Sequence, residues 1–328
     1  QRMSDAQTPV PAGIHRDRGA GLVVFGAVEI LIGLAFAALV PLTLVAVTFS
    51  PMVEIQLVVS SLALYAALAA IFIALGIGSI RARCWAQALT LSLSWVWLIT
   101  GFCTMVFSWW FLPGVWRDLG AGSGLDAGDA RMVALGINLF LSMIYVLLPG
   151  AFVLFYRSPD VIATCRARSS NPGWTDRCPQ RLLALAVAYV LGGLSIIAMP
   201  AYGFVFPFFG FLLSGAAGAA CWTAVLVLSG ALAWGTARGE PWAWWTAIAT
   251  GAAAGLSSAL TFAVVDPVEL FEIKGVLSEQ GPLFETLWPA SPWVHVAFHL
   301  VIWGSFIAYL AYIKHLFNPP LGRGRTRE

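Results

Sequence analysis

The sequence predicts an all-α, polytopic integral membrane protein with eight transmembrane helices, built as two tandem four-helix repeats in the same orientation. Three observations support this prediction. Hydrophobic residues make up 59% of the 328 residues and charged residues only 10%, whereas soluble domains carry about 25% charged residues. Eight apolar stretches approach or exceed the length of about 20 residues that crosses a bilayer. Short motifs of the first half recur in the second half at a nearly constant spacing.

The eight stretches are predicted to be helices, because backbone polar groups inside hydrocarbon must bond within their own segment. They cover residues 22–47, 58–80, 85–111, 132–155, 182–202, 208–234, 242–265 and 293–315. The chain then divides into a tail (1–20), a first repeat (21–156), a connector (157–181), a second repeat (182–315) with an outer loop (266–292), and a basic tail (316–328).

The distribution of basic residues predicts the orientation. Of the 18 Lys and Arg residues, only Arg117, Arg131 and Lys274 fall on the side opposite the predicted connector. By the positive-inside rule, both termini and the connector are expected in the cytoplasm of a bacterium, with the spans in its inner membrane. The basic side suits anionic lipid headgroups. Nucleic acid is not expected as a partner, since the basic residues are spread over many short loops.

The two halves share three matches in the same order. The segment "GAVEILIGL" (26–34) matches "AVAYVLGGL" (186–194), and "GSIRARCWA" (78–86) matches "GTARGEPWA" (235–243). Tyr156, at the end of the fourth span, falls on Tyr312 near the end of the eighth. Because each unit has an even number of spans, the two repeats are expected to share one orientation, related by an axis along the membrane normal.

The connector carries two thiols, Cys165 and Cys178. Ser158, Pro159 and Asp160 have the pattern of a helix start, and the helix would place Val161 and Cys165 on one face. A structural disulfide is not expected in a reducing compartment. Zinc needs about four ligands, and this stretch has no histidine. The thiols are therefore interpreted as packing residues, with metal or redox chemistry as the alternative.

The same segment carries a resemblance. The pattern "YRSPDV", then "TC", then "WTDRCP" ahead of an apolar span, together with the repeated Arg–Trp–Ala helix junction, resembles a group of uncharacterised bacterial multi-pass membrane proteins. The resemblance covers most of the chain. It implies a helical membrane protein and brings no site residues with it.

Polar side chains inside the spans are few, and they are candidate ligand or ion sites. Glu29 lies in the first third of the first span, and its match in the second half is Tyr189. A carboxylate at this position suits a proton carrier or cation ligand; the alternative is an interior hydrogen-bonding group. Asn138, in the fourth span, is expected to bond between helices. Gly251 and Gly255 predict close helix packing.

Aromatic residues and histidines supply two further candidates. Trp95, Trp97 and Trp303 lie deep in the spans, where they suit either a pocket for an apolar ligand or core packing. His295 and His299 lie four residues apart, a spacing that suits a metal, a haem or a chlorin. Asp266, Glu269 and Glu272 of the outer loop are predicted on the same side. The alternative is that both histidines are ordinary interface residues.

These observations leave three function classes. The chain has no P-loop, nucleophile elbow, HExxH or dinucleotide fingerprint, so an enzyme is the less favoured class; it would act on lipid or quinone. The favoured class is a non-catalytic subunit or scaffold that binds partner proteins, lipid or a hydrophobic ligand or pigment, or that forms a homo-oligomer. The second class is a transporter or channel for a small solute or ion, which normally needs more polar residues within its spans.

Overall fold

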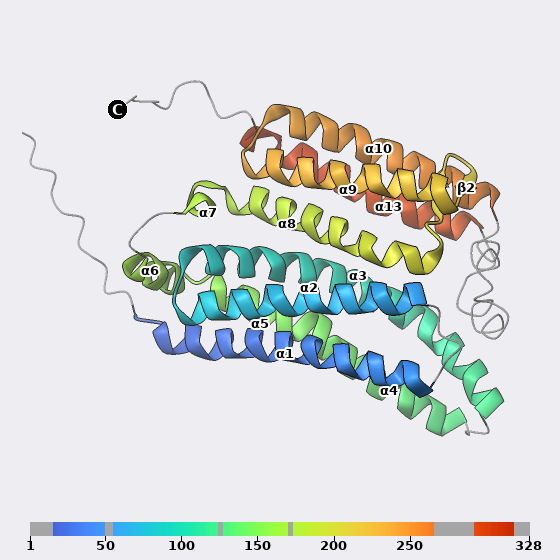
Figure 1. The fold of residues 1–328 in the computed structure, drawn as a ribbon, viewed down its shortest axis with the longest axis horizontal. Coiled ribbons are helices and arrows are strands. Elements are labelled where there is room, and N and C mark those ends of the chain that lie inside the picture. Colours follow the sequence, from blue (N-terminus) through green and yellow to red (C-terminus); the bar gives the residue numbers. More distant parts are fainter. Residues whose placement is uncertain (1–15, 50–54, 124–126, 170–172, 266–291, 318–328) are drawn as a thin grey trace, which may run out of the picture.

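The computed structural model describes residues 16–49, 55–123, 127–169, 173–265 and 292–317, and within them it is almost entirely helical (Figure 1). Eight helical segments in this part of the chain are long and apolar enough to cross a membrane. They are Gly19–Phe49, Ile55–Ile80, Cys84–Val106, Arg131–Tyr156, Gln180–Tyr202, Gly215–Ala237, Pro241–Val264 and Val296–Leu316. The predicted multi-pass helical membrane protein is therefore confirmed at the level of length and composition.

The first half contains four long helical segments. These are α1 (Gly19–Phe49), α2 (Ile55–Ile80), α3 (Cys84–Ser123), and a segment formed by α4 (Ala127–Ser142), the π-helical η1 (Met143–Leu147) and α5 (Leu148–Tyr156). Helix α1 packs along α2, and α3 packs against α4 and α5. Pro149 lies at the start of α5, immediately after the π-helical turn, which fits the link between proline and local departures from α-helical geometry.

The second half contains α8 (Gln180–Ser195), its 3₁₀ continuation η2 (Ile196–Tyr202), α9 (Gly215–Ala237), α10 (Pro241–Val264), α13 (Pro292–Ile313) and the 3₁₀ turn η3 (Lys314–Leu316). Helix α8 packs against α9, and α10 packs against α13. The halves meet where α3 packs against α8, and where α2 packs against η2. Figure 1 shows α8 between the first-half helices and α9, α10 and α13.

A short β-hairpin precedes the sixth span, so the predicted start of that helix at residue 208 is wrong. Strands β1 (Phe206–Phe208) and β2 (Phe211–Leu213) pair antiparallel. Gly203, Gly210 and Gly215 have positive φ, a conformation that glycine adopts readily and that a continuous helix does not contain. Helix α10 supplies hydrogen-bond acceptors for the backbone amides at the tip of the hairpin. The Ser257 and Thr261 hydroxyls accept hydrogen bonds from the amides of Phe209 and Gly210 at 2.9 and 3.0 Å.

Each half has its own apolar core. The first contains Leu22, Phe152, Tyr156, Val161 and Cys165. The second contains Leu182, Ala243, Trp244, Leu310 and Ile313. Several of these residues lie near the ends of the spans beside the connector, so both cores lie toward the same end of the bundle.

The connector forms two short helices, α6 (Pro159–Arg168) and α7 (Trp174–Arg177), on the left in Figure 1. We call this end of the bundle the connector end. The predicted helix start is confirmed, with Pro159 in the first turn, but the Ser158 side chain makes no capping bond. Val161 and Cys165 are both buried in the first core, as their spacing predicted.

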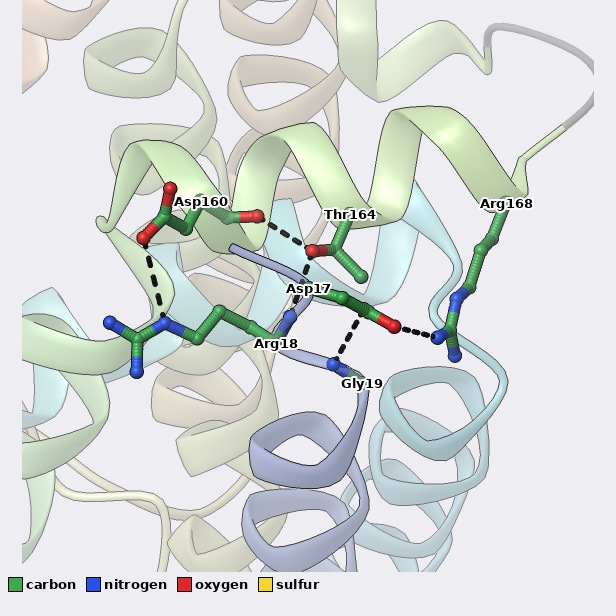
Figure 2. Close-up of polar contacts among 6 residues, drawn as sticks. All are labelled: Asp17, Arg18, Gly19, Asp160, Thr164 and Arg168. Carbon is green, nitrogen blue, oxygen red and sulfur yellow. Dashed lines mark hydrogen bonds and ion pairs between the residues drawn. The ribbon is translucent and has the colours of Figure 1, made fainter. Parts of the chain in front are cut away.

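Helix α6 is fastened to the start of α1 by polar contacts (Figure 2). The Arg168 guanidinium donates to the Asp17 carboxylate at 2.7 Å, and Arg18 pairs with Asp160 at 3.6 Å. Between these two ion pairs, the Arg18 amide donates to the Thr164 hydroxyl at 3.1 Å. Thr164 is buried, so its bond lies in the interior of the contact while both ion pairs are solvent-accessible.

The α2–α3 turn and the α9–α10 turn have the same hydrogen bonds. The carbonyl of Gly78 accepts from the Arg83 amide, and that of Gly235 from the Glu240 amide, both at 2.9 Å. One residue further on, the carbonyls of Ser79 and Thr236 each accept an amide at 2.9 Å. The side chains agree as well: the pair that lies against Gly78 is Trp85 with Ala86, and against Gly235 it is Trp242 with Ala243.

Small residues bring pairs of helices into close approach. A methyl group built on Gly76 would lie 2.6 Å from the backbone carbonyl oxygen of Gly26, and one on Gly26 would lie 2.8 Å from that of Gly76. Helices α1 and α2 therefore touch backbone to backbone at this point. Gly251 and Gly255 face Phe306 and Trp303 of α13, which confirms the packing role predicted for this pair.

Candidate functional site: a pocket between the two halves

A pocket of about 900 Å³ lies between the two halves at the connector end. Helices α2 and α3 form one wall, α8 and α9 form the other, and α7 borders the mouth. The walls are apolar, with side chains from Ile71, Leu75, Leu89, Leu93, Leu183, Ala186, Val187, Val190, Leu191, Ala233 and Ala237. The volume is within the range of about 300–1,000 Å³ that is usual for small-molecule sites.

Charged and aromatic side chains gather at the mouth of this pocket. Arg177 and Trp174 come from α7, Trp234 and Arg238 from the end of α9, and Glu240 from the turn that follows. The Arg238 guanidinium lies 4.1 Å from the centre of the Trp234 ring, a cation–π contact that holds the guanidinium at the rim. Among the described residues, the ion pairs at this end involve Arg18 and Arg168, and neither Arg177 nor Arg238 has an ion-pair partner.

The pocket extends along α8 for about the depth of one membrane leaflet. Its lining runs from Leu183 to Leu191 on this helix, which at 1.5 Å per residue corresponds to about 12 Å. Half of a hydrocarbon layer of about 30 Å is about 15 Å. The pocket therefore has one polar end at the connector end of the bundle and apolar walls over roughly one leaflet.

The two connector thiols lie in different surroundings. Cys165 belongs to the first core, and burial raises the pKa of its thiol to about 12. Cys178 is half-buried and lines the pocket, and burial raises the pKa of its thiol to about 11. Both are free thiols, and their raised pKa values favour the unreactive protonated form.

A second polar group, around Glu29, lies inside the first half. Glu29 is 1% exposed, and its carboxylate accepts a hydrogen bond of 3.0 Å from the Ser79 hydroxyl of α2. The hydroxyls of Tyr156 (α5) and Thr90 (α3) lie beside the same carboxylate. Among the described residues, neither of these hydroxyls nor the Glu29 Oε1 atom has a hydrogen-bond partner. The sequence identified Glu29 but not the three hydroxyl residues around it.

The other predicted interior polar residues do not join the Glu29 group. Tyr189 packs edge-on against Phe306 in the second half, and its buried hydroxyl has no hydrogen-bond partner among the described residues. Asn138 is buried and donates to the Ala134 carbonyl of its own helix at 3.0 Å. Tyr312, matched to the buried Tyr156, is 59% exposed, whereas Ile313 beside it is buried in the second core.

The predicted histidine site is described only in part. The His299 ring stacks on Phe262 of α10, with 4.5 Å between the ring centres. The side chain of His295, and residues Asp266, Glu269 and Glu272, lie outside the described part of the chain. In the described part, no group of three His, Cys, Asp or Glu residues is arranged to hold a metal ion.

The pocket itself was not predicted from the sequence. The aromatic residues suggested for an apolar pocket were Trp95, Trp97 and Trp303, and none of them lines it. The tryptophans at its mouth, Trp174 and Trp234, each lie three or four residues before an arginine. This pairing of tryptophan with arginine, in the connector for Trp174 and at the end of a span for Trp234, was the available signal, since amphipathic aromatic rings and arginine both favour the headgroup level.

Comparison with protein families, with curated proteins and with solved structures found no match to this chain. Its function is therefore inferred from its own residues.

Proposed function

We propose that this protein is a non-catalytic integral membrane protein, a subunit or scaffold, which holds a membrane lipid or another hydrophobic ligand between its two halves. The pocket is the observation that carries this proposal, because it combines apolar walls with a charged mouth. A water-filled pathway for a polar solute would need polar walls instead. The favoured partners are membrane lipids, together with protein subunits or further copies of the chain.

We place both termini and the connector in the cytoplasm of a bacterium, with the spans in its inner membrane. The basic residues at the connector end support this orientation. They include Arg16, Arg18, Arg81, Arg83, Arg157, Arg166, Arg168, Arg177, Arg181, Arg238 and Lys314.

A tandem duplication is the proposed origin of the two halves. The equivalent hydrogen bonds of the α2–α3 and α9–α10 turns support it, as do the matched contacts of Gly78 and Gly235. The same pairing of successive spans in each half, α1 with α2 and α8 with α9, also agrees with a duplication.

Ligand binding is tested by filling the pocket. Val190 lines the pocket on α8, whereas Val227 on α9 lies outside it, and both side chains are exposed. Val190→Trp should lower the number of lipid or ligand molecules that remain bound during native mass spectrometry of the purified protein. Val227→Trp is the matched control and should not change that number. Equal retention in both variants would contradict the proposal.

Orientation is tested with introduced cysteines in a chain whose own cysteines are replaced by serine or alanine. Arg166→Cys, on α6, should react with an impermeant thiol reagent only after the cells are broken. Arg131→Cys, at the start of the fourth span, should react in intact spheroplasts. Both arginines are exposed, so access within the protein is not limiting. The opposite pattern would reverse the orientation.

Ion transport is the second candidate function, and the Glu29 group is the observation that favours it. A buried carboxylate surrounded by three hydroxyls suits an exchangeable proton or a small cation. Reconstituted vesicles test this directly. If the protein moves ions, Glu29→Gln should abolish that movement while the protein remains folded.

A further inference from the structure

We propose that the occupant of the pocket is an anionic phospholipid from the leaflet at the connector end, bound through its phosphate by Arg177 and Arg238. This inference rests on the proposed ligand-binding function and names the class of ligand. It follows from the charge at the mouth, from the depth of the apolar walls, and from a comparison of the pocket with the surrounding bilayer.

The mouth of the pocket carries an excess of positive charge. Arg177 and Arg238 contribute two guanidinium groups, and Glu240 contributes one carboxylate. Neither arginine is occupied by an ion pair within the described part of the chain. A guanidinium presents a planar set of donors that matches the oxygen atoms of a phosphate, and such charge-assisted pairs are among the stronger hydrogen bonds in proteins.

The apolar walls fit a chain that enters from the same end as the headgroup. The mouth and the walls are continuous, and the walls extend for about 12 Å along α8, close to the half-thickness of the hydrocarbon layer. A phospholipid has this arrangement, with a charged group at the membrane surface and acyl chains directed toward the bilayer centre. Trp234, beneath Arg238, lies where aromatic rings usually mark the headgroup level.

The headgroup must determine which lipid is preferred. An acyl chain that leaves the bilayer for the pocket exchanges one apolar environment for another, so the hydrophobic effect contributes little to selectivity. The arginines distinguish lipids by charge, because the ammonium group of a zwitterionic lipid would be placed near two guanidinium groups. An anionic lipid such as phosphatidylglycerol, whose headgroup is an uncharged alcohol, brings no such cation. Selectivity for headgroup charge is therefore the expected signature of this site.

The experiment compares two double variants that remove the same charge from the same end of the bundle. The pocket variant is Arg177→Gln with Arg238→Gln. The control is Arg157→Gln with Arg166→Gln, which lie outside the pocket and have no ion pair in the described part of the chain. All four side chains are exposed, so both variants should retain the thermal stability of the wild type.

Each protein is placed in nanodiscs that contain equal amounts of phosphatidylglycerol and phosphatidylcholine, and the lipid that remains bound after ejection is identified by native mass spectrometry. We expect the wild type and the control to prefer phosphatidylglycerol by about 30-fold, the factor that corresponds to two arginines near anionic lipid at about 1 kcal/mol each, and the pocket variant to lose most of that preference.

Three results would overturn the inference. Equal loss of preference in both double variants would indicate general attraction of anionic lipid to the basic surface. A second result would be that the wild type retains both lipids without preference and that Val190→Trp abolishes this retention. It would leave the proposed ligand-binding function intact and refute only its anionic specificity. Absence of retained lipid from every protein would refute both proposals.

Discussion

The Ser79 hydroxyl donates a hydrogen bond to the Glu29 carboxylate across 3.0 Å, and this bond joins α2 to α1 in the interior of the first half. Tyr156 and Thr90 complete a group in which α1, α2, α3 and α5 each contribute one polar side chain. At the matched positions of the second half, Tyr189 replaces Glu29 and Thr236 replaces Ser79, and both of these hydroxyls are buried without a partner in the described part of the chain. The carboxylate therefore distinguishes the first half from the second.

Two substitutions of Glu29 should distinguish the contribution of its hydrogen bonds to stability from that of its charge. Glu29→Gln keeps an oxygen that accepts from Ser79 and adds an amide that donates to the neighbouring hydroxyls, so we expect the free energy of unfolding to change by less than about 1 kcal/mol. Glu29→Leu leaves the Ser79 hydroxyl buried without an acceptor and should cost about 1–3 kcal/mol. Thermal unfolding in detergent measures both. Equal destabilisation by the two variants would contradict this account.

The close approach of α1 and α2 predicts a strong dependence on glycine at position 76. Gly76→Ala would place a methyl group 2.6 Å from the Gly26 carbonyl oxygen, so the helices must separate, at a cost of about 1–3 kcal/mol. Gly230→Ala, in α9, is the matched control because nothing lies within 4 Å of the added methyl group. It should be neutral, or stabilising by up to about 1 kcal/mol, since alanine is the better helix former. Similar melting temperatures for both variants would refute the steric argument.

In the contact between α1 and α6, the part-buried hydrogen bond between the Arg18 amide and Thr164 should matter more than the two ion pairs. Arg168→Gln removes an exposed pair with Asp17, and such pairs contribute about 0–1 kcal/mol. Thr164→Val removes the acceptor of the Arg18 amide and should cost about 1–3 kcal/mol. Limited proteolysis of the connector and thermal unfolding would rank the two variants. A larger effect of Arg168→Gln would show that charge, and not the Arg18–Thr164 hydrogen bond, holds α6 against α1.

The long apolar elements of the fold were predictable because the hydrocarbon imposes one rule on every span. A run of about 20 apolar residues with few charges must be a helix, and this rule identified all eight spans. It misplaced the start of the sixth helix, because the run from Phe208 is as apolar as the helix that follows it. There, glycines with positive φ and the hydroxyls of Ser257 and Thr261 stabilise a hairpin, and neither feature changes the hydropathy.

The candidate site was less predictable, because it depends on how the halves pack. Glu29 could be identified as a charged residue within an apolar run, but Ser79, Thr90 and Tyr156 come from three other helices and have ordinary polar side chains. The pocket depends on the relative positions of α2, α3, α8 and α9. Local sequence determines which face of a helix is apolar, and it does not determine how far apart two apolar faces remain.

The thiol of Cys178 offers a probe of the pocket whose reactivity should depend steeply on pH. Burial raises its pKa to about 11, above the value of about 8.5 for a free thiol, so less thiolate is present at neutral pH than in an unfolded chain. The greater intrinsic nucleophilicity of a more basic thiolate offsets part of this loss. The net expectation is alkylation roughly 20- to 30-fold slower than that of a free thiol at pH 7, rising about tenfold per pH unit up to about pH 11.

The measurement uses a chain with Cys103→Ser and Cys221→Ser, which leaves the buried Cys84 and Cys165 as the other thiols. Iodoacetamide labelling at pH 7, 8 and 9, located by peptide mass spectrometry, should be concentrated at Cys178. Because Cys178 lines the pocket, labelling should be slower in nanodiscs that contain phosphatidylglycerol than in detergent free of lipid, and Val190→Trp should reduce that difference. Labelling at the rate of a free thiol at pH 7, unchanged by lipid, would place Cys178 in open solvent and contradict its position on the wall of the pocket.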